Sequence, residues 1–124
     1  MADRGRGGAV FVVGSLAFVA GAAYHAVGLV RPDWTEPIPP WRHAAFVAVN
    51  AGVVAGLLWR PRWFVAVFAL LVAQQLYGHS TYGWEVWRDE RRVDWASVAV
   101  VLGMPIVLAL LVRDALARPG DSGT

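Results

Sequence analysis

Four long apolar segments alternate with short polar segments along the chain. They cover about residues 8–30, 41–59, 63–84 and 95–112. At 1.5 Å per residue, segments of this length match a membrane hydrocarbon core of about 30 Å. Pro105 lies inside the last segment, but a transmembrane helix tolerates proline where neighbouring groups satisfy the freed carbonyl. The pattern predicts an all-α integral membrane protein, a four-helix bundle with up-down-up-down topology.

The polar segments predict how these spans are connected. Residues 60–62 form a tight turn, and residues 31–40 hold four of the seven prolines, which favours a stiff, extended loop. Residues 85–94 carry mixed charges and are expected to be solvated surface. The tail from about residue 114 is rich in glycine, serine and proline and is expected to be disordered. The chain is therefore expected to form a single membrane domain.

The tryptophans lie at or just beyond the predicted helix ends. Such positions are typical of an aromatic belt, in which indole rings lie at the depth of the lipid headgroups. A signal peptide is an alternative for the first segment, but its apolar run continues to Val30 and is longer than a typical signal-peptide core. All seven tryptophans fit the belt: Trp34, Trp41, Trp59, Trp63, Trp84, Trp87 and Trp95.

The composition supports a membrane protein and excludes several other classes. The chain is 57% hydrophobic and 16% charged, against roughly 45–50% and about 25% in soluble domains. This argues against a disordered protein and against a nucleic-acid partner. The absence of cysteine excludes disulfides, thiolate metal ligands and cysteine nucleophiles.

The arginines give an expectation for orientation and source. All 11 basic residues are arginine, and six of them fall on the side of the two termini against five on the other side. By the positive-inside rule, both termini are expected to be cytoplasmic. The use of arginine alone, with much alanine, valine and glycine, suggests a bacterium with a high-GC genome, so we expect a multi-pass protein of the bacterial inner membrane.

All three histidines fall in the same, outer half of the predicted bundle. His25 lies six residues before Arg31, His79 lies five residues before Trp84, and His43 begins the second span. Polar side chains inside a membrane are costly and usually face the interior of the helix bundle. The histidines therefore mark the outer half as the place for a site.

Helical spacing extends this histidine cluster into a candidate pocket. On the third span, Gln75 and His79 are four residues apart, and Tyr82 follows one turn later. On the second span, His43 and Asn50 are seven residues apart and share a face. On the first span, glycines that allow close helix packing share a face with His25, which is therefore expected to point at a neighbouring helix. The predicted ligand-binding residues are His25, His43, Asn50, Gln75, His79 and Tyr82, and the glycines are Gly14, Gly21 and Gly28.

Three kinds of ligand suit this pocket. In an up-down bundle the first and third spans are diagonal, so His25 and His79 can approach a haem iron from opposite faces. Alternatively, His25, His43 and His79 bind a divalent metal, with Glu36 or Glu85 at the rim. A quinone or another lipid-like molecule, hydrogen-bonded by the polar groups, is the third alternative. No diagnostic motif decides among them.

Other functions remain open beside ligand binding. The polar side chains can simply bond neighbouring helices, and the chain can be a non-catalytic accessory subunit of a larger membrane complex or form a homo-oligomer. A membrane enzyme that acts on a lipidic substrate is a third alternative, with Glu36 or Glu85 and a histidine as its acid–base pair. Serine catalysis is disfavoured because the serines, Ser97 among them, have no recognisable base around them in the sequence.

Overall fold

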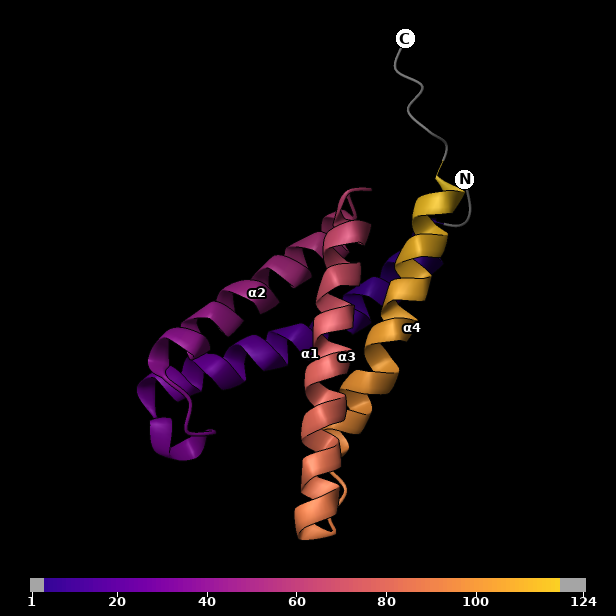
Figure 1. Cartoon of the computed structure of the whole chain (residues 1–124). Coiled ribbons are helices and arrows are strands. Elements are labelled where there is room, and N and C mark those ends of the chain that lie inside the picture. Colours follow the sequence, from indigo (N-terminus) through magenta and orange to yellow (C-terminus); the bar gives the residue numbers. More distant parts are fainter. Residues whose placement is uncertain (1–3, 119–124) are drawn as a thin grey trace. The chain divides into compact units, whose positions relative to one another are not determined.

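The protein is all-α in the part of the chain that the structure, a computed structural model, describes (Figure 1). This part comprises residues 4–118, with the backbone alone described for residues 4–7. Its helices are α1 (Arg4–Val30), the short 3-10 helix η1 (Pro32–Trp34), α2 (Pro40–Trp59), α3 (Phe64–Glu90) and α4 (Trp95–Ala117). The four long helices are long and apolar enough to cross a membrane. The predicted fold class is thereby confirmed, and a four-helix bundle is consistent with it.

The helices form two compact units, Met1–Arg60 and Pro61–Thr124. In the first unit α1 packs against α2, and in the second α3 packs against α4. Each unit is a helical hairpin, because a short connection joins its two helices.

Two helices continue beyond the ends that the sequence predicts. α3 extends through residues 85–90, which were expected to lie in the connection between the spans. α4 extends through residues 113–117, of which 114–117 were expected to belong to the disordered tail. Charged side chains end an apolar segment but do not end a helix, because they are good helix formers in water. α3 ends instead at Glu90, and the C-cap residue Arg91 adopts the left-handed conformation with φ 53°. Residues 119–124 lie outside the described part.

The α1/α2 hairpin has a regular register in which the numbers of facing residues add up to 71. The Arg60 guanidinium lies 5.1 Å from the centre of the Phe11 ring at one end of the hairpin. At the other end, Gly28 faces the ring of His43. Between them, Gly21 faces Asn50 in the same register. The glycines at 21 and 28 thus allow the close approach to a neighbouring helix that the sequence indicates, whereas Gly14 borders open space.

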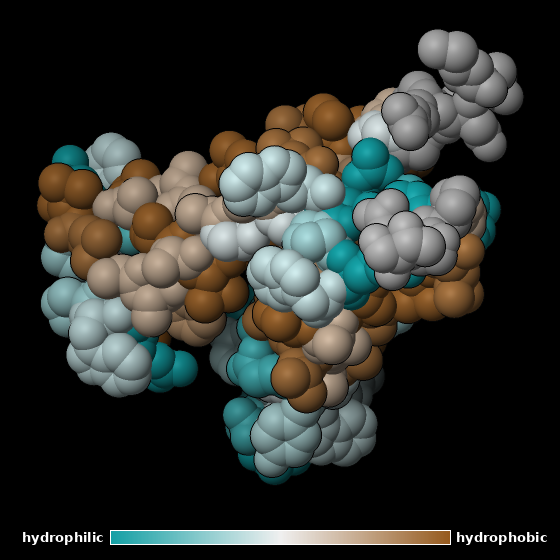
Figure 2. All heavy atoms as spheres, turned by 90° about the horizontal axis from the view of Figure 1, so that it is seen from above, coloured by the Kyte–Doolittle hydropathy of each residue, from teal (hydrophilic) through white to brown (hydrophobic). Residues whose placement is uncertain are grey.

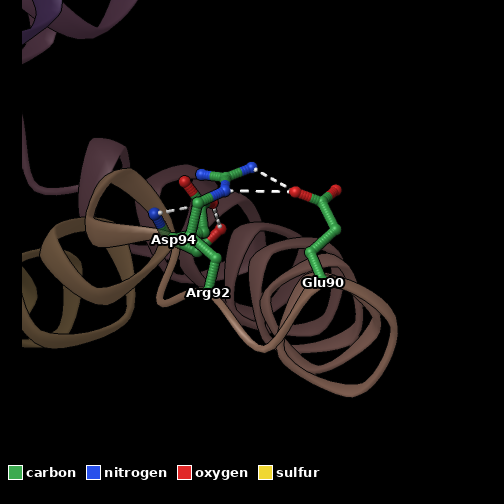
Figure 3. A network of polar contacts seen from close by, with 4 residues as sticks. Glu90, Arg92 and Asp94 are labelled. Carbon is green, nitrogen blue, oxygen red and sulfur yellow. Dashed lines mark hydrogen bonds and ion pairs between the residues drawn. The ribbon is translucent and has the colours of Figure 1, made fainter.

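The α3/α4 hairpin is built around fully buried apolar side chains and a polar cap. Phe68 and Leu111 are completely buried. Asp94 is the N-cap of α4, and its carboxylate accepts a hydrogen bond from the backbone N–H of Ser97. In the turn between the helices, the guanidinium of Arg92 donates to the carboxylate of Glu90, as Figure 3 shows. Glu90 and Arg92 therefore form a local ion pair beside the cap.

The connection between α1 and α2 is tied to the end of α1 by polar contacts. The Arg31 guanidinium lies 4.2 Å from the centre of the Trp34 ring and forms an ion pair with Asp33 at 3.0 Å. This hydrogen-bonded guanidinium lowers the pKa of the Asp33 carboxyl group. Further along, the backbone N–H of Glu36 donates to the Tyr24 hydroxyl at 3.1 Å. The connection is thus held over the histidine-bearing end of α1.

Large apolar side chains and all seven tryptophans are exposed on the hairpins. Figure 2 shows brown, hydrophobic side chains spread over much of the visible helical surface. The tryptophan side chains are between 43% and 85% exposed. Trp84 and Trp87 lie within the last two turns of α3, because that helix is longer than predicted. This surface is suited to lipid contact.

Candidate functional site

The α1/α2 hairpin brings two imidazoles together. The Nδ1 atoms of His25 and His43 are 3.0 Å apart, which is hydrogen-bonding distance. His43 is 1% exposed, and Phe46 stacks on the His25 ring with centroids 4.6 Å apart and planes 21° apart. His25 therefore does point at the neighbouring helix.

This hydrogen bond requires that the two facing nitrogens carry one hydrogen between them. One Nδ1 must carry a hydrogen and the other must present a lone pair, because two facing N–H groups repel and two facing lone pairs form no bond. The pair therefore has two tautomeric forms, in which either His43 or His25 is the donor. In both forms the second nitrogen of His43, Nε2, is left to find a partner elsewhere.

His43 Nε2 is buried and has no hydrogen-bond partner in the part of the chain that the structure describes. The ring lies against Gly28: a Cβ atom at that position would come within 2.5 Å of His43 Cε1 and 2.8 Å of Nε2. The absence of a side chain at residue 28 thus makes room for the imidazole. An unsatisfied buried polar atom costs about 1–3 kcal/mol, so a group that bonds this nitrogen would be favoured.

The described residues around the pair form no complete metal site. Glu36 lies in the connection after α1, where its backbone N–H donates to the hydroxyl of Tyr24, the sequence neighbour of His25. Among the described residues, no three histidine or acidic side chains are grouped closely enough to hold a metal ion. His25 and His43 belong to one hairpin and His79 to the other, so the predicted three-histidine metal site stays a prediction.

The α3/α4 hairpin holds the third histidine, His79, in a chain of hydrogen bonds. His79 Nδ1 lies 3.0 Å from Ser97 Oγ, and Ser97 Oγ lies 2.5 Å from Asp94 Oδ2. Gly83, one turn beyond His79, allows this approach, because a Cβ atom there would lie 3.3 Å from the Ser97 Cβ. The result is a polar cluster of three side chains from the end of α3 and the start of α4.

The order of these side chains differs from that of a serine-nucleophile triad. In such a triad the histidine lies between the serine and the acid and removes the serine proton. Here Ser97 lies in the middle and donates its proton to Asp94. The cluster therefore lacks the order in which a histidine removes the serine proton.

The remaining predicted site residues are less closely engaged. Asn50 lies over Gly21 and donates from its amide to the Phe46 carbonyl at 2.8 Å, so it acts within α2. Gln75 donates to the side chain of its neighbour Gln74 at 2.7 Å. Tyr82 is 54% exposed. The hydrogen bond of Asn50 goes to Phe46 and not to His25 or His43, and the ligand-binding role of all three residues stays a prediction.

Sequence reasoning missed two contributors to the polar cluster of the second hairpin. The sequence shows no base near Ser97 and places Asp94 in a solvated charged segment. In the structure Ser97 bonds both Asp94 and His79. One signal was available: an aspartate directly before an apolar segment is a typical N-cap, and its side chain turns back toward the residues that follow. The sequence does not show which residue of α3 lies opposite Ser97, so the contact with His79 could not be predicted.

Comparison with known proteins finds no match for this chain among protein families, curated proteins or solved structures.

Proposed function

We propose that this chain is a multi-pass protein of the bacterial inner membrane, with both termini in the cytoplasm, that binds a metal ion or a metal-containing cofactor through imidazole nitrogens in the outer half of its spans. The four long apolar helices and the exposed tryptophans, which suit an aromatic belt, support the membrane location. The weak arginine excess on the side of the termini supports the orientation.

The observation that carries the proposal is the state of His43. Its Nδ1 is held by His25, and its Nε2 is buried without a partner among the described residues. A histidine that binds a metal through one nitrogen commonly gives the hydrogen of its other nitrogen to a nearby acceptor. When His43 donates from Nδ1 to His25, its Nε2 lone pair is free to be such a ligand.

We propose different roles for the two histidines of this pair. Their Nδ1 atoms are engaged with each other at 3.0 Å, whereas His43 Nε2 is buried without a partner among the described residues. His43 Nε2 would therefore be the metal ligand, and His25 would orient the His43 ring.

Metal analysis tests this proposal directly. Protein purified in mild detergent from its native membrane is expected to contain iron, zinc or copper at nearly one atom per chain by mass spectrometry. His43→Ala removes the ligand and should abolish this occupancy. His25→Ala removes only the orienting partner, for which a loss of about 10–100-fold in metal affinity is expected.

The control is Ser15→Ala, which removes another buried polar side chain of α1. Ser15 donates its hydroxyl hydrogen to the Phe11 carbonyl of its own helix, so its loss should leave metal binding unchanged. His43→Gln serves as a second variant of similar size, in case His43→Ala disturbs folding. Metal absent from the purified protein and not taken up on addition of zinc, copper, iron or haem would refute the proposal.

An accessory subunit of a larger complex is the second candidate function, and one observation favours it. Gln74 is exposed on α3 in the middle of a candidate span, and its side-chain oxygen accepts from Gln75. Amides in a membrane are usually bonded to protein groups, because lipid offers no hydrogen-bond partner. A stable partner protein that copurifies from native membranes, and is lost in Gln74→Leu, would favour this role.

A further inference from the structure

We infer that Asp94 and Ser97 are positioning residues that hold His79 as the tautomer protonated at Nδ1, and that its Nε2 lone pair is the atom offered by the α3/α4 hairpin to a transition-metal ion or a haem iron. The inference about the tautomer stands on the hydrogen bonds alone. The inference about the metal rests on the proposed function.

The argument begins with Asp94, whose position is fixed by its role at the start of α4. Its Oδ2 accepts from the backbone N–H of Ser97 at 3.2 Å and from the Ser97 hydroxyl at 2.5 Å. An ionised carboxylate can only accept hydrogen bonds. Both hydrogens in these contacts therefore come from Ser97. The dashed lines at Asp94 in Figure 3 mark the two contacts.

The direction of the next hydrogen bond follows from the single proton of a hydroxyl group. Ser97 gives that proton to Asp94, so toward His79 its oxygen has only lone pairs to offer. The 3.0 Å contact between Ser97 Oγ and His79 Nδ1 must then be donated by the histidine. In a neutral imidazole only one nitrogen carries hydrogen, so His79 Nε2 is left as a lone pair.

Packing between the helices keeps this arrangement in place. Ser97 is 3% exposed, and it lies against Gly83 on the same side of α3 as His79. A buried hydroxyl with both an acceptor and a donor satisfied has little freedom to reorient. The histidine ring is therefore held from its Nδ1 side, while Nε2 makes no hydrogen bond to the described residues.

This arrangement matches the chemistry of a metal-binding histidine. The imidazole of such a ligand typically donates its second N–H toward a carboxylate, directly or through a hydrogen-bonding intermediary, which fixes the ring and strengthens the ligand. Neutral imidazole nitrogen suits iron, copper and zinc. His43 resembles His79 in one respect: its Nδ1 is engaged, here by His25, and its Nε2 has no partner among the described residues.

Nitrogen-15 NMR of histidine-labelled protein tests the tautomer without any metal. The sample is the full chain in detergent, free of metal, at about pH 8.5, where imidazole is neutral. His79, assigned by its loss in His79→Gln, is expected as the Nδ1–H form in the wild type. In Ser97→Ala the signal should move to the Nε2–H form that free imidazole side chains prefer, and Ser97→Thr should restore the Nδ1–H form.

Ser80→Ala is the matched control, because Ser80 adjoins His79 in sequence but is exposed and takes no part in the cluster. It should leave the tautomer unchanged. An Nε2–H tautomer in the wild type, or an unchanged tautomer in Ser97→Ala, would overturn the inference whatever the protein binds.

Titration with Co²⁺ tests the second part with the same variants. The affinity is expected to fall by about 10–100-fold in Ser97→Ala and to stay unchanged in Ser80→Ala. Equal affinity of Ser97→Ala and the wild type would refute the role of His79 Nε2 as a positioned ligand. Absence of Co²⁺ binding by the wild type would instead count against the proposed function, while the NMR result decides the tautomer separately.

Discussion

Gly28→Ala is expected to lower the stability of the α1/α2 hairpin and to break the contact between His25 and His43. The added Cβ would come within 2.5–2.8 Å of three atoms of the His43 ring. This ring is rigid and buried, so it has to move as a whole. Overpacking of this kind typically costs about 1–3 kcal/mol, and the measurement is the thermal unfolding midpoint in detergent, together with metal occupancy.

Two other glycines of α1 provide matched controls for this substitution. Gly14 lies two heptads before Gly28 and has nothing within 4 Å of its Cβ position. Gly14→Ala should therefore stabilise the helix, by up to about 1 kcal/mol from helix propensity. Gly21→Ala should fall between the two, because its Cβ would meet the amide of Asn50 at 2.8 Å, and that amide can rotate away. An equal effect of all three substitutions would contradict the close packing of His43 on Gly28.

Asp94→Ala is expected to give the largest destabilisation among the acidic residues of the second hairpin. The change removes the N-cap of α4, which is typically worth about 0.5–2 kcal/mol, and it deprives the buried Ser97 hydroxyl of its acceptor. We expect a lower unfolding midpoint and faster hydrogen exchange of the first-turn amides of α4. Hydrogen exchange of α1 and α2 amides should stay as in the wild type.

Asp89→Ala provides the comparison for Asp94→Ala. Asp89 lies five residues earlier and forms an exposed ion pair with Arg88. Exposed pairs of this kind contribute little to stability, so no measurable change is expected. If Asp89→Ala and Asp94→Ala lowered the midpoint equally, the cap and the hydroxyl contact would have no special role.

The helices could be predicted from the sequence because each depends on local properties. An apolar segment of sufficient length indicates a membrane-spanning helix, whichever helix it packs against. All four segments correspond to helices in the structure. The ends were predicted less well. The sequence shows where the apolar run stops, as at Trp84, but α3 continues to Glu90 because charged residues sustain a helix outside the hydrocarbon core.

The candidate site could be predicted only in part, because it depends on which residues face each other across a hairpin. The sequence placed His25 on the glycine-bearing face of its helix, and that face does contact His43. It did not show that Ser97 lies opposite His79, since a register between helices leaves no local mark. The histidine tautomers could not be predicted from the sequence either, because they depend on hydrogen bonds that form only when the helices pack in this register.

The interval of seven residues between Gly21 and Gly28, matched by Asn50 and His43 on α2, restricts how the length of this hairpin can vary. One residue inserted between the two glycines would turn the rest of α1 by about 100° and advance it by about 1.5 Å. Gly28 would then no longer face His43, although no residue of the hairpin had been removed. A whole inserted heptad would restore the face to within about 20° but would displace Gly28 by about 10 Å along the axis. Length variation in relatives of this chain should therefore be confined to the connection over residues 31–39 and to the ends of the hairpin.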